Sequence, residues 1–221
     1  MIRRLRLASG LVMFAYVTTH FVNHSLGLVS VQVMDRALEH IYHYWASLLG
    51  SVLLYGAFAT HYSLALWALW LRRSLKMPFA EATQLVLGFS IPFFLTDHVL
   101  QTRVADTFYG ADVGYYSTML HTYFVSNPLR GGLQLTVLVI AWVHAMIGLW
   151  FWLRLKRWYQ RWQPILYAFA LLMPTLHFQR SFPGSFNTRS GGTAARAASM
   201  FAMVIVSMIL VVAKTRIAAC G

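Results

Sequence analysis

Long apolar blocks constrain this chain of 221 residues more than any other feature. Only 11% of its residues are charged, whereas a soluble domain carries about 25%. Most blocks reach or approach the ~20 residues that cross a ~30 Å hydrocarbon core as a helix. The blocks lack the alternation of barrel strands, so we predict an all-α, polytopic membrane bundle of about six transmembrane helices. The blocks lie at roughly 7–29, 44–71, 83–102, 130–153, 164–177 and 196–213.

The basic residues form short clusters between the apolar blocks. If the N-terminus is cytoplasmic, twelve of the 18 Lys and Arg residues lie on the cytoplasmic side. This bias follows the positive-inside rule and predicts a multi-pass protein with both termini cytoplasmic. Anionic lipid headgroups are sufficient partners for the net charge of +12,. No basic face or motif accompanies it, so we expect no nucleic-acid partner.

The cysteine content excludes several kinds of site. Cys220 is the only cysteine, so no disulfide forms within one chain,. A thiolate metal site is equally excluded. The motif C-x-x-C-H is absent, so any haem is held without thioether links,.

Nine histidines are unusual in so apolar a chain. Ionisable residues inside spans are costly and normally face the bundle interior to perform a function. Six of the nine lie within spans or at their edges: His20, His24, His61, His98, His144 and His177. The remaining three lie in or beside the predicted outside segments, where an interfacial place is expected: His40, His43 and His121.

Four of these histidines fall at two predicted depths. Counting residues from the inner basic clusters places His61 and His144 ~15 Å above the cytoplasmic boundary. The same count places His20 and His98 ~21–23 Å above it. Each pair is divided between two helices, as a bis-histidine haem between helices requires. Zinc would need three or four ligands at one level. Proton relay and simple packing are competing roles for such histidines.

Three further residues are candidates for cofactor contacts. His24 shares a helix face with His20. We prefer His20 as the ligand, and His24 then lies at a haem edge or a quinone site. Arg103 is placed to meet haem propionates, or serves only as a topology charge. Asp97 is either a proton acceptor beside a quinone or the partner of Arg103. No internal repeat is evident.

Four stretches closely resemble the six-span N-terminal membrane anchor of bacterial class III adenylate cyclases. That anchor is in turn similar to the dihaem cytochrome b subunit of succinate dehydrogenases and fumarate reductases. The stretches are SGLVMFAYVTTHFVNHSLG (9–27), LLYGAFATHYSLALWALWLRRSLKMP (53–78), DHVLQTR (97–103) and AWVHAMIGLWFWLRLKRWY (141–159).

The resemblance implies two non-covalent b haems, held by His20 (or His24), His61, His98 and His144. It also implies a bacterial inner-membrane location, sensitivity to the quinone pool and a cytoplasmic cyclase domain as partner. A homodimer is a further expected assembly. The alternative is a cytochrome b subunit of a respiratory complex, whose partners would be other respiratory subunits.

The resemblance fades after Pro174. We therefore expect a dihaem-type domain of five helices over residues 1–177, with a four-helix haem-binding core. A polar loop and a last transmembrane helix then cover residues 178–221. No cyclase domain follows before Gly221, so this chain is not expected to make cyclic AMP by itself.

Overall fold

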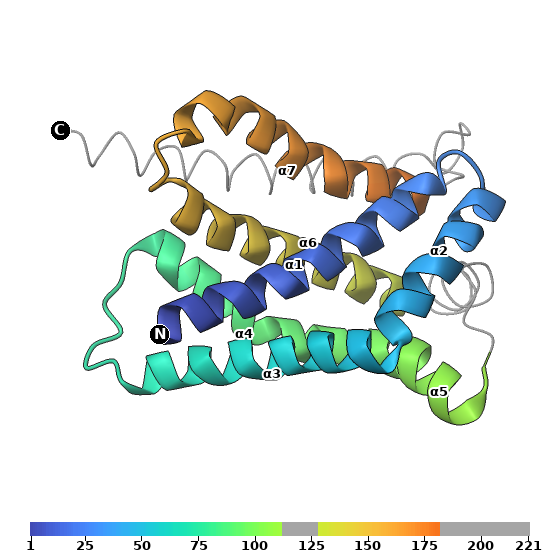
Figure 1. Cartoon of the computed structure of the whole chain (residues 1–221), viewed down its shortest axis with the longest axis horizontal. Coiled ribbons are helices and arrows are strands. Elements are labelled where there is room, and N and C mark those ends of the chain that lie inside the picture. Colours follow the sequence, from blue (N-terminus) through green and yellow to red (C-terminus); the bar gives the residue numbers. More distant parts are fainter. Residues whose placement is uncertain (112–127, 182–221) are drawn as a thin grey trace. The chain divides into compact units, whose positions relative to one another are not determined.

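The computed structural model describes residues 1–111 and 128–181, and these residues are helical almost throughout (Figure 1). The chain divides into two compact units, Met1–Met77 and Pro78–Gly221. Each unit is built on a pair of long helices that pack against each other. These are α1 with α3 in the first unit and α4 with α6 in the second. The predicted all-α class is confirmed for the described residues.

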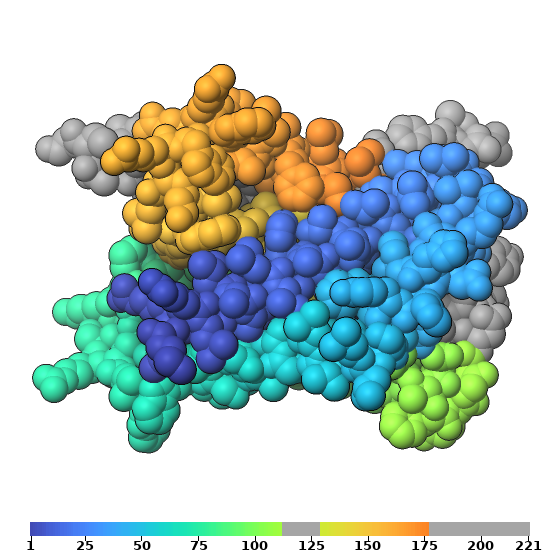
Figure 2. Space-filling view, viewed as in Figure 1, coloured from blue at the N-terminus to red at the C-terminus, as the bar shows by residue number. Residues whose placement is uncertain are grey.

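The first unit consists of α1 (Ile2–Leu26), α2 (Val31–Ala46) and α3 (Leu48–Trp70). Serine caps set the start of the second and third helices. The Ser30 hydroxyl accepts from the Val33 N–H at 3.1 Å, and the Ser47 hydroxyl accepts from the Gly50 N–H at 3.1 Å. Figure 2 shows the side chains of α1, α2 and α3 packed together in this unit.

The second unit begins with α4 (Phe79–Val99), which continues into a π-helical turn, η1 (Leu100–Val104), and α5 (Ala105–Tyr109). Gly110 ends this segment in the left-handed conformation (φ 61°), which glycine adopts without steric cost,. After residues 112–127 follow α6 (Pro128–Leu153) and α7 (Tyr159–Ser181). Proline is common at the first position of a helix, where its missing N–H leaves no intrahelical bond unmade, and α6 begins with Pro128,.

Four of the described helices are long and apolar enough to cross a membrane: Ile2–Leu26, Leu48–Trp70, Phe79–Tyr109 and Leu129–Leu153. Large apolar side chains are exposed on these helices, including Leu48 at 83% exposure and Phe93 at 79%. Such surface is stable in lipid but not in water. The chain is therefore a membrane protein with at least these four candidate spans.

Two of the six predicted spans are not among these four helices. The fifth block, 164–177, lies within α7, which is helical but does not reach the hydropathy of the four spans. The sixth, 196–213, lies outside the described residues, as do the predicted polar loop after residue 181 and His121. The count of six spans therefore stays a prediction.

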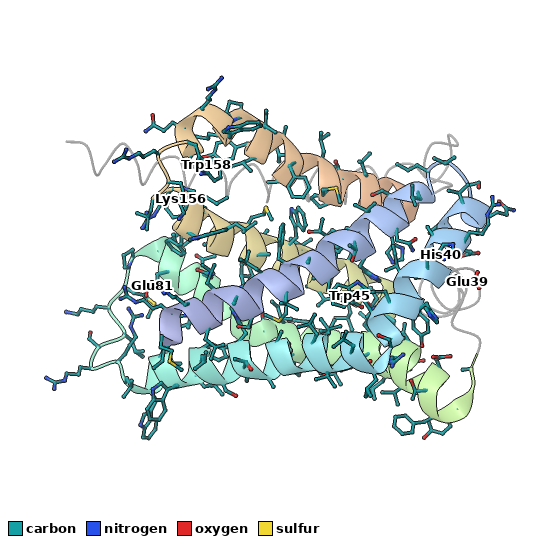
Figure 3. The ribbon with its side chains drawn as sticks, viewed as in Figure 1. Glu39, His40, Trp45, Glu81, Lys156 and Trp158 are labelled. Carbon is teal, nitrogen blue, oxygen red and sulfur yellow. The ribbon has the colours of Figure 1, made fainter. Side chains whose placement is uncertain are left out.

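One helix was not expected from the apolar blocks. The segment between the first two spans forms α2, whose Met34 is fully buried while Glu39 and His40 are exposed. Its Trp45 lies where α2 approaches α1 and makes an edge-on contact with Tyr16 at 5.3 Å between ring centroids (Figure 3). His40 and His43 are exposed on this helix, and their interfacial place stays a prediction.

Candidate functional site

His61 of α3 is held against the first turns of α1. Its Nδ1 lies 2.9 Å from the backbone oxygen of Arg6. A carbonyl oxygen can only accept, so Nδ1 is the protonated nitrogen and donates this bond. The hydroxyl of the buried Ser9 lies 3.5 Å from the same nitrogen. In a neutral ring, Nε2 is then the nitrogen that carries the lone pair, which is the form in which imidazole binds a metal.

His144 of α6 repeats this arrangement in the second unit. Its Nδ1 lies 2.9 Å from the backbone oxygen of Gln84 on α4. By the same reasoning this nitrogen donates, and Nε2 carries the lone pair. Metal-ligating histidines almost always donate their other ring N–H to a carboxylate or a backbone carbonyl in this way. Both histidines therefore have the supporting backbone contact of a metal ligand, and the donor set suits a haem iron.

The likeness between the units extends to a few positions of their sequences. Each long helix pair matches the other at spaced positions. The residues Leu7, Gly10, Thr18 and His20 of α1 recur 78 positions later as Leu85, Gly88, Thr96 and His98 of α4. The residues His61, Leu66 and Trp67 of α3 recur 83 positions later as His144, Leu149 and Trp150 of α6. The matches are few and widely spaced, and they include the glycine and the histidine that lie against each other in each unit.

His20 and His24 lie together near the end of α1. Their Nε2 atoms are 3.2 Å apart, so one ring donates and the other accepts,. The ring of Tyr16 stacks on His20 at 5.8 Å between centroids. Asn23 is fully buried on the same helix, and both polar atoms of its amide lack a hydrogen-bond partner among the described residues. This end of unit 1 therefore holds more buried polar groups than packing requires.

His98 lies in the last turn of α4, directly after Asp97. The chain turns into the π-helical segment two residues later, and π-helical turns frequently mark functional sites,. Arg103 is part of that turn. The ion pair of Asp97 is with Nε of Arg130 on α6, at 3.8 Å, where the sequence had suggested Arg103.

Within each unit the candidate ligands lie at two levels. In unit 1 the ring of His61 lies beside Gly10, and His20 follows ten residues later on the same helix. In unit 2 the ring of His144 lies beside Gly88, and ten residues again separate that glycine from His98. Ten residues of helix rise ~15 Å. This separation exceeds the ~6–8 Å that counting from the basic clusters had implied.

The predicted pairs His61–His144 and His20–His98 each draw on both units, so the pairing stays a prediction from the sequence. Among the described residues, no three His, Cys, Asp or Glu side chains gather as zinc sites require,. The side chain of His177, on α7, lies outside the described part of the chain.

Sequence reasoning missed Gly10 and Gly88, which lie directly against His61 and His144. A glycine ten residues before a histidine in two different spans was the available signal. It carries meaning only once the facing helix of each pair is known, because the histidine that touches the glycine comes from that facing helix.

Comparison with known proteins provides no relative from which a role could be transferred. No protein-family model, no curated protein and no solved structure matches the chain. The function is therefore argued from the histidines and their contacts, and membership of the cyclase-anchor family stays an expectation.

Proposed function

We propose that this chain is a dihaem b-type membrane domain that responds to the redox state of the quinone pool. The observation that carries the proposal is the matched pair of histidines, His61 and His144, each with Nδ1 bonded to a backbone oxygen at 2.9 Å. Both are thereby presented in the tautomer that an axial ligand needs. A bound haem supplies one-electron chemistry whose potential the axial ligands and their hydrogen bonds tune.

The residues of the chain bind and orient the cofactor. His61 and His144 present Nε2 at the inner level, and His20 and His98 are the proposed ligands at the outer level. His20 is favoured over His24 because it follows Gly10 by ten residues, just as His98 follows Gly88 by ten residues. Binding iron through Nε2 requires His20 to release its contact with His24, which lies at 3.2 Å. His24 then becomes available to a neighbouring ligand.

Three side chains are proposed to act around the haems rather than on the iron. His24 and Asp97 are candidates for contacts with quinone oxygens or for proton exchange. Asp97 fits such a role because its Oδ2 is buried and has no hydrogen-bond partner among the described residues. Arg103 is proposed to hold propionate groups, since a guanidinium binds carboxylates through two parallel hydrogen bonds.

The signalling role comes from the resemblance to class III cyclase anchors. A change in haem charge alters the electrostatics of nearby groups such as Asp97 and Arg103 in a medium of low dielectric constant. Such a change biases the bundle only if two packings stabilise that charge differently. The proposed output is a cytoplasmic catalytic domain reached through the C-terminal segment.

Fusion of the whole chain to a class III cyclase catalytic domain tests this proposal. Cyclic AMP production should change when the membrane quinone pool is switched between oxidised and reduced forms. The change should vanish in His61→Ala and persist in His40→Ala, an exposed histidine of α2 that serves as the control. A fusion with full haem content and an activity indifferent to redox state would contradict the sensor role. That result would instead favour the cytochrome b subunit of a respiratory complex.

A further inference from the structure

Each unit contains the same dock for an imidazole ring, formed by two positions on the first long helix. A backbone oxygen accepts the ring N–H, from Arg6 in one unit and Gln84 in the other. A glycine follows four residues later, Gly10 or Gly88. Four residues are about one helical turn, so oxygen and glycine lie on one face of the helix.

The glycines leave room that any side chain would fill. A Cβ at Gly10 would lie 3.1 Å from Cε1 and 3.3 Å from Nδ1 of His61. At Gly88 it would lie 2.6 Å from Cε1 and 3.0 Å from Nδ1 of His144. Carbon atoms in good contact are about 3.5–4.0 Å apart. Alanine at either position would therefore push the ring away from the carbonyl that orients it.

Close approach of two helix backbones is the usual reason for glycine in a membrane helix, and it does not apply here. Gly50 is a glycine of that kind, because a Cβ there would meet backbone atoms of Tyr44 and Trp45. At Gly10 and Gly88, by contrast, the nearest atoms outside the glycine's own helix backbone belong to a histidine ring. The space at these two glycines is therefore shaped for an imidazole.

We infer that Gly10 and Gly88 are positioning residues, which let His61 and His144 dock with Nδ1–H on the helix backbone and with the lone pair on Nε2. The docking concerns the protein without cofactor, whereas the role of Nε2 rests on the proposed haem function. The shorter distance at Gly88 makes its substitution the more severe of the two. Alanine is otherwise the better helix former, so a loss at these positions does not come from the helix itself.

The first test needs no haem. Haem-free protein in detergent is labelled with ¹⁵N-histidine, and the ring signals of His61 and His144 are assigned with His61→Gln and His144→Gln. Both rings should show the Nδ1–H tautomer. Gly88→Ala should convert the His144 signal to a mixture of tautomers, and Gly10→Ala should do the same to His61 more weakly. An unchanged His144 tautomer in Gly88→Ala would overturn the dock.

Matched controls exist on the facing helices. Among the described residues, no atom would lie within 4 Å of a Cβ at Gly56 of α3 or at Gly132 of α6. Gly56→Ala and Gly132→Ala should leave both tautomers unchanged. A tautomer change in these variants equal to that in Gly88→Ala would show a general response to alanine, and would also overturn the inference.

The second test uses haem-loaded protein. Loss of the group that orients a metal-ligating histidine typically weakens metal binding 10–100-fold. We expect Gly88→Ala to weaken the binding of one haem by that factor and to change the low-spin EPR signal of that haem. The affinity for the other haem should stay within about twofold of the wild-type value. Equal weakening of both would indicate a packing defect and contradict a positioning role. Wild-type protein that binds no haem would refute the proposed function, while the tautomer result would still decide the dock.

Discussion

Trp142 is predicted to replace a hydrogen bond that α7 cannot make for itself. The indole is 1% exposed, and its N–H donates to the backbone oxygen of Ala170 at 2.8 Å. In a regular helix the donor to that oxygen would be the N–H four residues later, but residue 174 is proline and has none,. Trp142→Phe should therefore leave the half-buried carbonyl of Ala170 without its side-chain donor.

The cost can be estimated from general values. A buried acceptor left without a partner costs about 1–3 kcal/mol. Interhelical hydrogen bonds measured in membranes average about 0.6 kcal/mol, with a maximum near 1.7. We therefore expect Trp142→Phe to lower the free energy of unfolding by about 1–2 kcal/mol. In a Pro174→Ala background the restored backbone N–H satisfies Ala170, so the same substitution should cost about 1 kcal/mol less.

Reversible unfolding in mixed detergent and SDS micelles measures the four members of this double-mutant cycle. The cycle cancels the volume change from indole to phenyl, which is the same in both backgrounds. Trp162→Phe is a suitable control, because Trp162 of α7 is half exposed; its effect should stay within about 0.5 kcal/mol. An equal cost of Trp142→Phe in both backgrounds would refute the argument.

Two further predictions concern the buried polar groups. His61→Ala and His144→Ala should abolish one step of a haem redox titration, and His20→Ala and His98→Ala the other; loss of the same step in His61→Ala and His98→Ala would contradict the pairing by depth. Asn23→Leu should raise the free energy of unfolding by about 1 kcal/mol or more, because it removes a buried amide that has no hydrogen-bond partner among the described residues,; the same micelle assay would contradict this if leucine destabilised the protein.

Composition was sufficient to predict the membrane class and the four apolar spans. Hydropathy depends on residues close in sequence, and each of these spans is apolar along most of its length. The helix α2 was missed because it is amphipathic. Apolar residues such as Met34 and polar residues such as Glu39 lie on different sides of the helix, so the sequence contains no continuous apolar block there. The mean hydropathy of α7 is below that of the four spans because polar residues such as Gln163 lie at its start.

The candidate ligands were predictable because a histidine in an apolar span stands out by itself. Their partners were not. The Nδ1 of His144 bonds to a backbone oxygen. Every residue has such an oxygen, so the residue types alone do not predict this contact. Gly88 has meaning only beside that ring, 56 residues away in sequence. The pairing of Asp97 with Arg130 likewise depends on which helix packs beside α4.

The central claim is that this chain holds two non-covalent b haems through intramembrane histidines. Absorption spectra of the purified, correctly inserted protein, oxidised and dithionite-reduced, test it directly when combined with a pyridine haemochrome assay. The account predicts low-spin b-type spectra and about two haems per polypeptide, all extractable with acidic acetone. Protein that is folded and inserted but shows no Soret band would contradict it.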